Sequence, residues 1–172
     1  MGRELRKVPA GWEHPLRDCP HSPWDGGCSE SKKHNGKCYQ PMFNRYYGDA
    51  IKEWITGHEL WLDGTHPDLQ RDPILKDKYP FYAMYHGGPP DVEYYQTKKY
   101  SPEELTHIQL YQTTSEGTPL SPVFHASEFE KLCEWAAVNA TTFAQFKTSK
   151  EEWMRMLSND LVYHQRGNMI FI

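Results

Sequence analysis

Residues 101–138 read SPEELTHIQLYQTTSEGTPLSPVFHASEFEKLCEWAAV, and this stretch holds two helix-start signals of the same kind. Ser101 is followed three residues later by Glu104, and the same spacing recurs from Ser127 to Glu130. In such a capping box the serine oxygen accepts from an early helical N–H, while the glutamate accepts from the serine's own N–H. The two signals predict helices over about 102–112 and 128–138.

Outside this stretch, three further elements follow from spacing alone. A third Ser-to-Glu pair at Ser149 predicts a helix over about 150–157. Apolar residues recur at helical intervals from Tyr47 to about Leu62, although Gly57 interrupts them. The last stretch, LVYHQRGNMIFI, alternates around a glycine-containing turn and predicts a β-hairpin.

The rest of the chain is expected to form ordered loops around one core. Residues 63–100 are rich in proline and glycine and keep no single period, so we expect irregular and short extended pieces. With 172 residues, the chain fits one domain. The sequence therefore predicts a single α+β domain, 1–172, with about four helices, a small C-terminal hairpin and long ordered loops.

Composition restricts the classes of function. The formal net charge of −4, from 23 acidic and 19 basic residues, lacks the basic excess typical of nonspecific nucleic-acid binders. No stretch is apolar enough for a secretory signal or a membrane span, and a cytoplasmic protein is expected. In that reducing compartment clustered cysteines favour metal binding over disulfides.

Several segments resemble small accessory proteins encoded by tailed bacteriophages and prophages. The segment EELTHIQLYQTTSEGTPLSPVF at 103–124 is the most distinctive. The others, in the same order as in that family, are RKVPAGWEHP at 6–15, YQPMF at 39–43, PPDVEYY at 89–95 and the EFEKLCEWAA helix. The resemblance implies an accessory phage protein located in the host cytoplasm, and it implies no catalytic residues.

The segment CPHSPWDGGCSESKKHNGKC, residues 19–38, predicts a zinc site. Three thiolates and one imidazole suit a tetrahedral structural zinc. An ion would also explain order in so polar a segment, whose alternatives are a solvated loop or a disulfide or redox role. The predicted ligands are Cys19, Cys28, His34 and Cys38, with His21 as an alternative.

No catalytic constellation accompanies this cluster. Neither the HExxH nor the HxE and PCxxC signature of zinc enzymes occurs, so a bound zinc is expected to be structural. His107 is expected to be a hydrogen-bonded structural histidine on a helix, and Cys133 a buried, inert thiol. We therefore expect a protein without enzymatic activity.

Residues 79–100, YPFYAMYHGGPPDVEYYQTKKY, are dense in aromatic side chains and are the predicted partner-binding segment. Tyrosine offers rigid contact area with a polar tip, as at many protein interfaces. The alternative is that the rings complete a core poor in aliphatic residues. The predicted contact residues are Tyr82, Tyr85, Tyr94 and Tyr95.

Together these features predict a phage-like accessory protein that binds a host protein and inhibits host defence or other host machinery. Two alternatives remain open. One is a zinc-knuckle-like module that binds nucleic acid, because small lysine clusters occur at 32–37 and 98–99. The other is a structural component of the virion.

Overall fold

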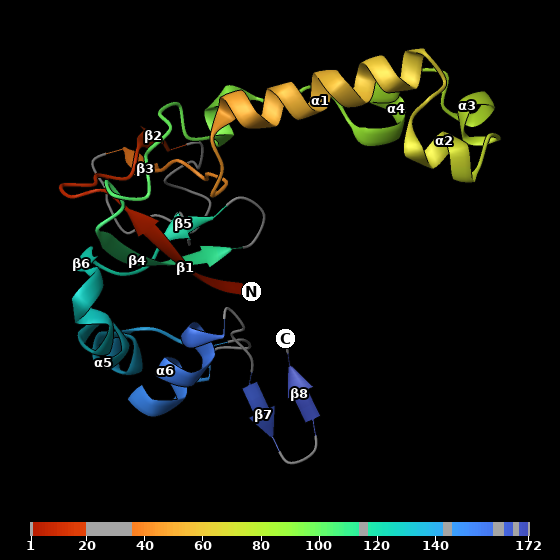
Figure 1. Cartoon of the computed structure of the whole chain (residues 1–172). Coiled ribbons are helices and arrows are strands. Elements are labelled where there is room, and N and C mark those ends of the chain that lie inside the picture. The colour runs from red at the N-terminus through yellow and green to blue at the C-terminus, as the bar shows by residue number, and fades with distance from the viewer. Residues whose placement is uncertain are drawn as a thin grey trace. The chain divides into compact units, whose positions relative to one another are not determined.

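The computed structural model describes residues 2–19, 36–113, 117–142, 146–159, 164–166 and 169–171 (Figure 1). In these ranges the chain is α+β, as predicted, and every pair of named strands is antiparallel. Its contacts divide it into two compact units. Unit 1 comprises Met1–Asn44 and Tyr100–Ile172, and unit 2 comprises Arg45–Lys99. The single-domain assignment stays a prediction.

A small sheet organises unit 1. Strands β1 (Gly2–Val8) and β4 (His107–Thr113) pair along their whole length. The short strands β5 (Thr118–Pro119) and β6 (Phe124–His125) each pair with β4. Strand β4 therefore lies between the N-terminal strand and the segment that begins at Gly117.

One face of this sheet packs against α5 (Phe129–Asn139) and α6 (Lys150–Ser158). Leu5 and Leu110 are opposite one another across β1 and β4, and both contribute to this core. Arg6 and Gln109, the next pair along, lie on the other face because side chains alternate along a strand. The fully buried core residues include Leu110, Leu132, Cys133, Ala136, Trp153 and Met156.

Helices α5 and α6 confirm two of the predictions. Ser149 caps α6, because its hydroxyl accepts the N–H of Glu152 as expected. At α5 the box lies earlier than predicted: His125 and Glu128 cap the 3-10 turn η2 (Ala126–Glu128), which leads into the helix.

The helix predicted over about 102–112 is wrong, because this segment forms a turn and then strand β4. Glu104 does accept the N–H of Ser101, at 2.8 Å, but this half of the capping box only closes the turn. In HIQLYQT, alternation lets Ile108 and Leu110 face the helices while Gln109 and Tyr111 face away. Pairing with all seven residues of β1 outweighs the local helix signal.

Unit 2 is helical. The long helix α1 (Tyr47–Leu62) has the predicted bounds. The segment predicted as irregular also contains helices, namely α2 (Pro67–Arg71), α3 (Leu75–Lys78), α4 (Tyr82–His86) and the 3-10 turn η1 (Val92–Tyr94). Gly57 fits within α1 because a Cβ there would lie 2.3 Å from the Tyr82 hydroxyl. The absence of a side chain at Gly57 therefore allows α4 to pack closely against α1.

Two hairpins complete the described elements. Strands β7 (His164–Arg166) and β8 (Met169–Phe171) pair antiparallel, which confirms the predicted C-terminal hairpin. Strands β2 (Leu16–Asp18) and β3 (Lys37–Tyr39) pair at the base of the cysteine-rich segment. Among the helices described, none has the length and apolar character needed to cross a membrane.

Candidate functional site

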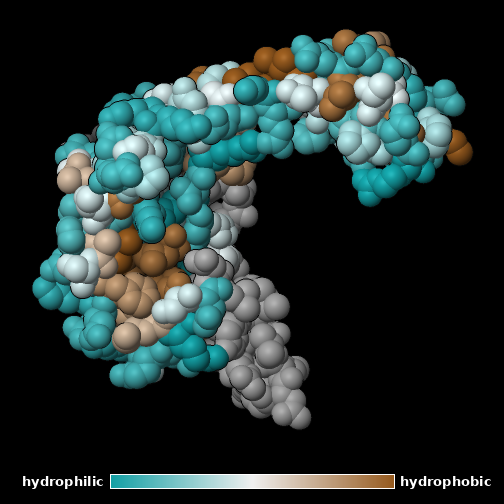
Figure 2. Space-filling view, viewed as in Figure 1, coloured by the Kyte–Doolittle hydropathy of each residue, from teal (hydrophilic) through white to brown (hydrophobic). Residues whose placement is uncertain are grey.

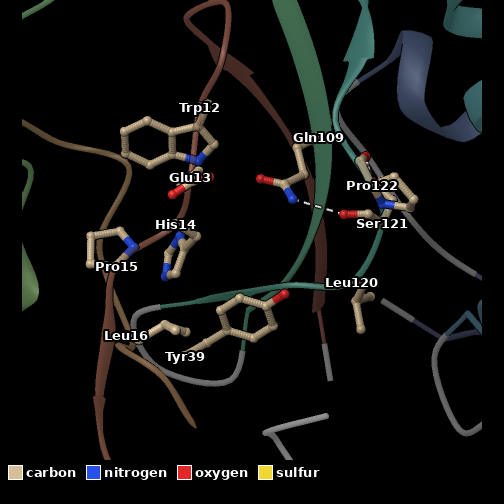
Figure 3. Close-up of a pocket in the computed structure, with 10 residues that line it drawn as sticks. All are labelled: Trp12, Glu13, His14, Pro15, Leu16, Tyr39, Gln109, Leu120, Ser121 and Pro122. Carbon is tan, nitrogen blue, oxygen red and sulfur yellow. Dashed lines mark hydrogen bonds between the residues drawn. The ribbon is translucent and has the colours of Figure 1, made fainter. Parts of the chain in front are cut away.

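Unit 1 has a hollow of about 760 Å³ beside the sheet face that carries Gln109 and Tyr111. The chain between β1 and β2 forms one side, while β4 and the residues after β5 form the other (Figure 3). The lining residues are Trp12, Glu13, His14, Pro15, Leu16, Tyr39, Gln109, Leu120, Ser121 and Pro122.

A hydrogen-bond network fixes the inner wall. His14 Nε2 lies 2.6 Å from the Gln40 carbonyl oxygen, which can only accept, so this nitrogen carries the proton. The neutral ring then accepts at Nδ1 from the Tyr111 hydroxyl, 3.0 Å away. That hydroxyl in turn accepts from Trp12 Nε1 at 3.1 Å. Every polar atom in this chain of contacts has a matching partner.

The network favours the uncharged imidazole. Burial lowers the pKa of His14 to about 4, and the nearby positive charge of Arg6 contributes, although the bond to the Gln40 carbonyl acts in the opposite direction. Arg6 is itself buried, lies 4.2 Å from the centre of the Tyr111 ring and donates to the Met42 carbonyl oxygen. Burial also raises the pKa of Tyr111 to about 12. Both groups are neutral near pH 7.

Gln109 projects from β4 toward the hollow and is only 6% exposed. Its Nε2 donates to the Ser121 carbonyl oxygen at 2.8 Å, which fixes the orientation of the amide. Ser121 is held by two more bonds: its hydroxyl accepts the Leu110 N–H and donates to the Pro122 carbonyl oxygen. The amide oxygen of Gln109 is buried and has no hydrogen-bond partner.

The predicted zinc ligands fall partly outside the described residues. Cys28, His34 and His21 are in that position, whereas Cys19 and Cys38 are described. Cys38 is opposite Arg17, and the Cys19 N–H bonds to the Gly36 carbonyl oxygen, which continues the β2–β3 ladder. Side-chain alternation then places both cysteines on one face of the hairpin.

Within the described ranges, no group of three or more histidine, cysteine or acidic side chains is arranged to hold a metal ion. This finding concerns only two of the predicted ligands. The zinc site therefore stays a prediction, and β2 and β3 bring together Cys19 and Cys38, the two predicted ligands that the structure describes.

The four predicted contact tyrosines all belong to unit 2. Tyr82 is 4% exposed and packs with Trp61 and Leu69, as the core interpretation expects. Tyr85 is half-buried, stacks on Trp61 with ring centres 4.5 Å apart, and donates its hydroxyl to Asp68. Tyr94 and Tyr95 are half-buried as well. Their assignment as contact residues stays a prediction.

Sequence analysis missed the neighbours of these tyrosines. Phe81 is 62% exposed, Met84 58% and Ile74 72%, although all three are large and apolar. Figure 2 shows hydrophobic residues on the surface over α1 and over the short helices of unit 2. A spacing of three residues in the sequence could have indicated them. Residues 82 and 85 face inward, whereas residues 81 and 84 face outward.

The other residues considered in the sequence have neighbours that explain them as parts of the fold. His107 lies on β4 rather than on a helix, and its Nδ1 is 2.9 Å from the Thr106 hydroxyl. Cys133 is fully buried as predicted, and burial raises the pKa of its thiol to about 11. Lys37 and Lys99 pair with Asp18 and Asp49, which offsets their positive charge.

Comparisons with protein-family models, curated proteins and solved structures found no match, so the functional interpretation depends on the residues of this chain.

Proposed function

We propose that the chain is a non-enzymatic, phage-type accessory protein that binds a protein of the bacterial host through unit 2 and thereby inhibits host defence or other host machinery. The observation that carries this proposal is the set of large apolar side chains exposed on unit 2. They are Ile55, Leu62, Ile74, Phe81, Met84 and Val92. Exposed apolar groups on a stable support are typical of protein-binding surfaces.

The support beneath these side chains is a rigid aromatic cluster. Trp61 is fully buried, and its Nε1 donates to the Tyr79 carbonyl oxygen at 3.1 Å. Tyr85 stacks on one side of it, and Tyr82 packs against it with ring centres 5.9 Å apart. Because these rings are held in place, the backbone that carries Phe81 and Met84 is already ordered, and binding a partner costs only the freedom of the two side chains.

The charge of unit 2 favours a protein partner over nucleic acid. Residues 45–99 contain nine acidic and seven basic side chains. Several of the basic ones pair with carboxylates, including Arg45 with Glu53, Arg71 with Asp68 and Lys99 with Asp49. Such a surface lacks the positive field that attracts a phosphate backbone.

Affinity capture from bacterial lysate tests this proposal. We expect wild-type protein to retain one stoichiometric host protein, in lysate treated with nuclease as well as in untreated lysate. The double variant Phe81→Ser, Met84→Ser should lose it, because serine lacks the aromatic ring of Phe81 and the thioether chain of Met84 that would supply the apolar contact. Val138→Ser, an equally exposed apolar residue on α5, is the matched control and should retain it.

Retention by the Phe81→Ser, Met84→Ser variant would overturn the assignment of the surface to unit 2. Capture that disappears with nuclease would overturn the protein-binding proposal and favour the nucleic-acid alternative. Recovery of the protein from purified virions, without a captured host protein, would favour the virion alternative.

We also propose that the segment 19–38 binds one structural zinc ion. The support is the ligand chemistry of the segment together with the β2–β3 hairpin, which places Cys19 and Cys38 on one face. A zinc ion bound there would stabilise a polar segment that has few apolar side chains to bury.

Removal of zinc should destabilise unit 1. We expect a chelator to lower the melting temperature and Cys38→Ser to have the same effect, because metal binding free energy contributes directly to folding. Elemental analysis should find one zinc per chain. Cys133→Ser is the control for loss of a buried thiol, and it should leave the zinc content unchanged. A preparation that contains no metal and whose melting temperature is unchanged by the chelator would contradict the zinc proposal.

A further inference from the structure

We propose that the hollow of unit 1 binds a small, uncharged ligand in which a flat ring carries an N–H donor, and that the Gln109 amide oxygen accepts that donor. This site is distinct from the surface on unit 2 and does not depend on it. The ligand class that fits is an aromatic primary amide or a similar heteroaromatic N–H compound.

The first argument is the unpartnered acceptor. Nearly all buried polar atoms in proteins have a hydrogen-bond partner, so a buried amide oxygen without one calls for an explanation. The Ser121 carbonyl oxygen holds the amide nitrogen of Gln109, so the amide cannot flip without setting two acceptors against each other. Figure 3 shows the amide oxygen directed away from Ser121, toward the side of the hollow where Trp12 lies.

The second argument is the fixed position of the rings. Trp12 is tied by Nε1 to Tyr111 and meets the Tyr100 ring edge-on, with centres 6.2 Å apart. Tyr39 meets the His14 ring edge-on at 5.6 Å. Apolar side chains of Leu120 and Pro122 complete the lining. Hollows lined by rings and polar groups in fixed positions are typical of small-ligand sites.

The third argument concerns charge. Both ring nitrogens of His14 are engaged, so the histidine offers the ligand neither a donor nor an acceptor. Arg6 is opposite Gln109 across β1 and β4 and pairs with Glu4 at 3.0 Å, so this pair leaves no free negative charge to hold a cationic ligand. Glu13 is the only ionisable carboxylate among the lining residues, and it is exposed. A neutral N–H donor therefore suits the Gln109 oxygen better than an ammonium or guanidinium group.

The amide oxygen is closed to water in the free chain. One lining side chain must rotate before a ligand N–H can reach the oxygen, while the rings of Trp12 and His14 stay in place through their hydrogen bonds. The oxygen then gains a hydrogen bond without giving up one to water. Selectivity should therefore depend on the N–H group more than on the size of the ring.

NMR titration of the full chain with benzamide and with methyl benzoate tests the proposal. The two probes have similar shape, but only benzamide has an N–H donor. We expect saturable binding of benzamide, about tenfold or more tighter than that of methyl benzoate. The cation benzamidine should bind more weakly than benzamide.

The Gln109→Met variant should bind the two probes equally, because methionine keeps the length of the side chain and lacks the amide acceptor. Gln112→Met, on the same strand but the opposite sheet face, is the matched control and should keep the preference. Equal binding of the two probes by the wild-type protein, or no benzamide binding, would overturn the proposal even if Gln109→Met does not fold. Neither result bears on capture of a host protein through unit 2.

Discussion

The free energy of unfolding should fall by about 3 kcal/mol between pH 6.5 and pH 4 because of His14 alone. The pKa of this buried imidazole is lowered to about 4 in the folded chain, from an ordinary value of 6.5. Between these two values the unfolded chain binds the proton and the folded chain does not, so acid favours unfolding. The contribution is fully present above pH 6.5 and is lost as the pH falls toward 4.

The physical cause is the closed network around the ring. A proton on Nδ1 would have to replace the bond that the Tyr111 hydroxyl now donates, in a buried position that also faces the guanidinium of Arg6. Neither partner of the imidazole is a carboxylate, since Nε2 contacts the Gln40 carbonyl oxygen. A charged ring at this site would therefore lack compensation.

Urea denaturation at several pH values measures this effect. His14→Gln should be less stable at pH 7 and should lack most of the loss between pH 6.5 and 4. His107→Gln, a histidine substitution on β4 outside the network, should keep the wild-type slope. Carboxylates with lowered pKa, such as Asp18, lose their contribution at lower pH still, so their effect is separable. An unchanged slope in His14→Gln would contradict the assignment.

Local signals in the sequence were sufficient for the helices whose determinants are local. The apolar period of α1 and the Ser149 cap of α6 operate within one or two turns, and both helices were predicted with nearly the observed bounds. Strand β4 was missed because its partner is remote. Leu5 and Leu110 are opposite one another across a separation of more than one hundred residues, which no local spacing reveals.

The hollow of unit 1 was beyond sequence reasoning for the same reason. Its polar groups come from the chain after β1, from β3 and from β4, and they meet only through strand pairing. His14 and Gln109 carry no motif. What distinguishes them is burial combined with a specific pattern of satisfied and unsatisfied bonds, which exists only in the folded chain.

The aromatic segment of unit 2 shows what sequence analysis leaves unseen when a short helix goes unrecognised. Residues 79–100 were singled out by aromatic content, but reading them as irregular concealed the short helix α4. Once α4 is known, its two faces separate. Tyr82 belongs to the core, while Phe81 and Met84 face outward and carry the proposed partner surface.

Trp61→Ala should destabilise unit 2 by about 3–5 kcal/mol, which is the usual cost of removing a buried tryptophan. The indole is fully buried, stacks on Tyr85 and donates to the Tyr79 carbonyl oxygen, so the substitution removes both packing and a hydrogen bond. Chemical denaturation would measure the loss of stability, and amide hydrogen exchange would locate that loss in residues 45–99. Leu62→Ala, the exposed neighbour on α1, is the control and should change stability by less than about 0.5 kcal/mol.

The same variant distinguishes support from contact in the proposed function. Trp61 does not reach the surface, yet its loss should weaken partner binding because Phe81 and Met84 would no longer be held on a rigid base. Phe81→Ser should weaken binding with little change in stability, since its side chain is already exposed. A Trp61→Ala protein that is destabilised in unit 2 but binds its partner at full affinity would show that the partner surface lies elsewhere on the chain.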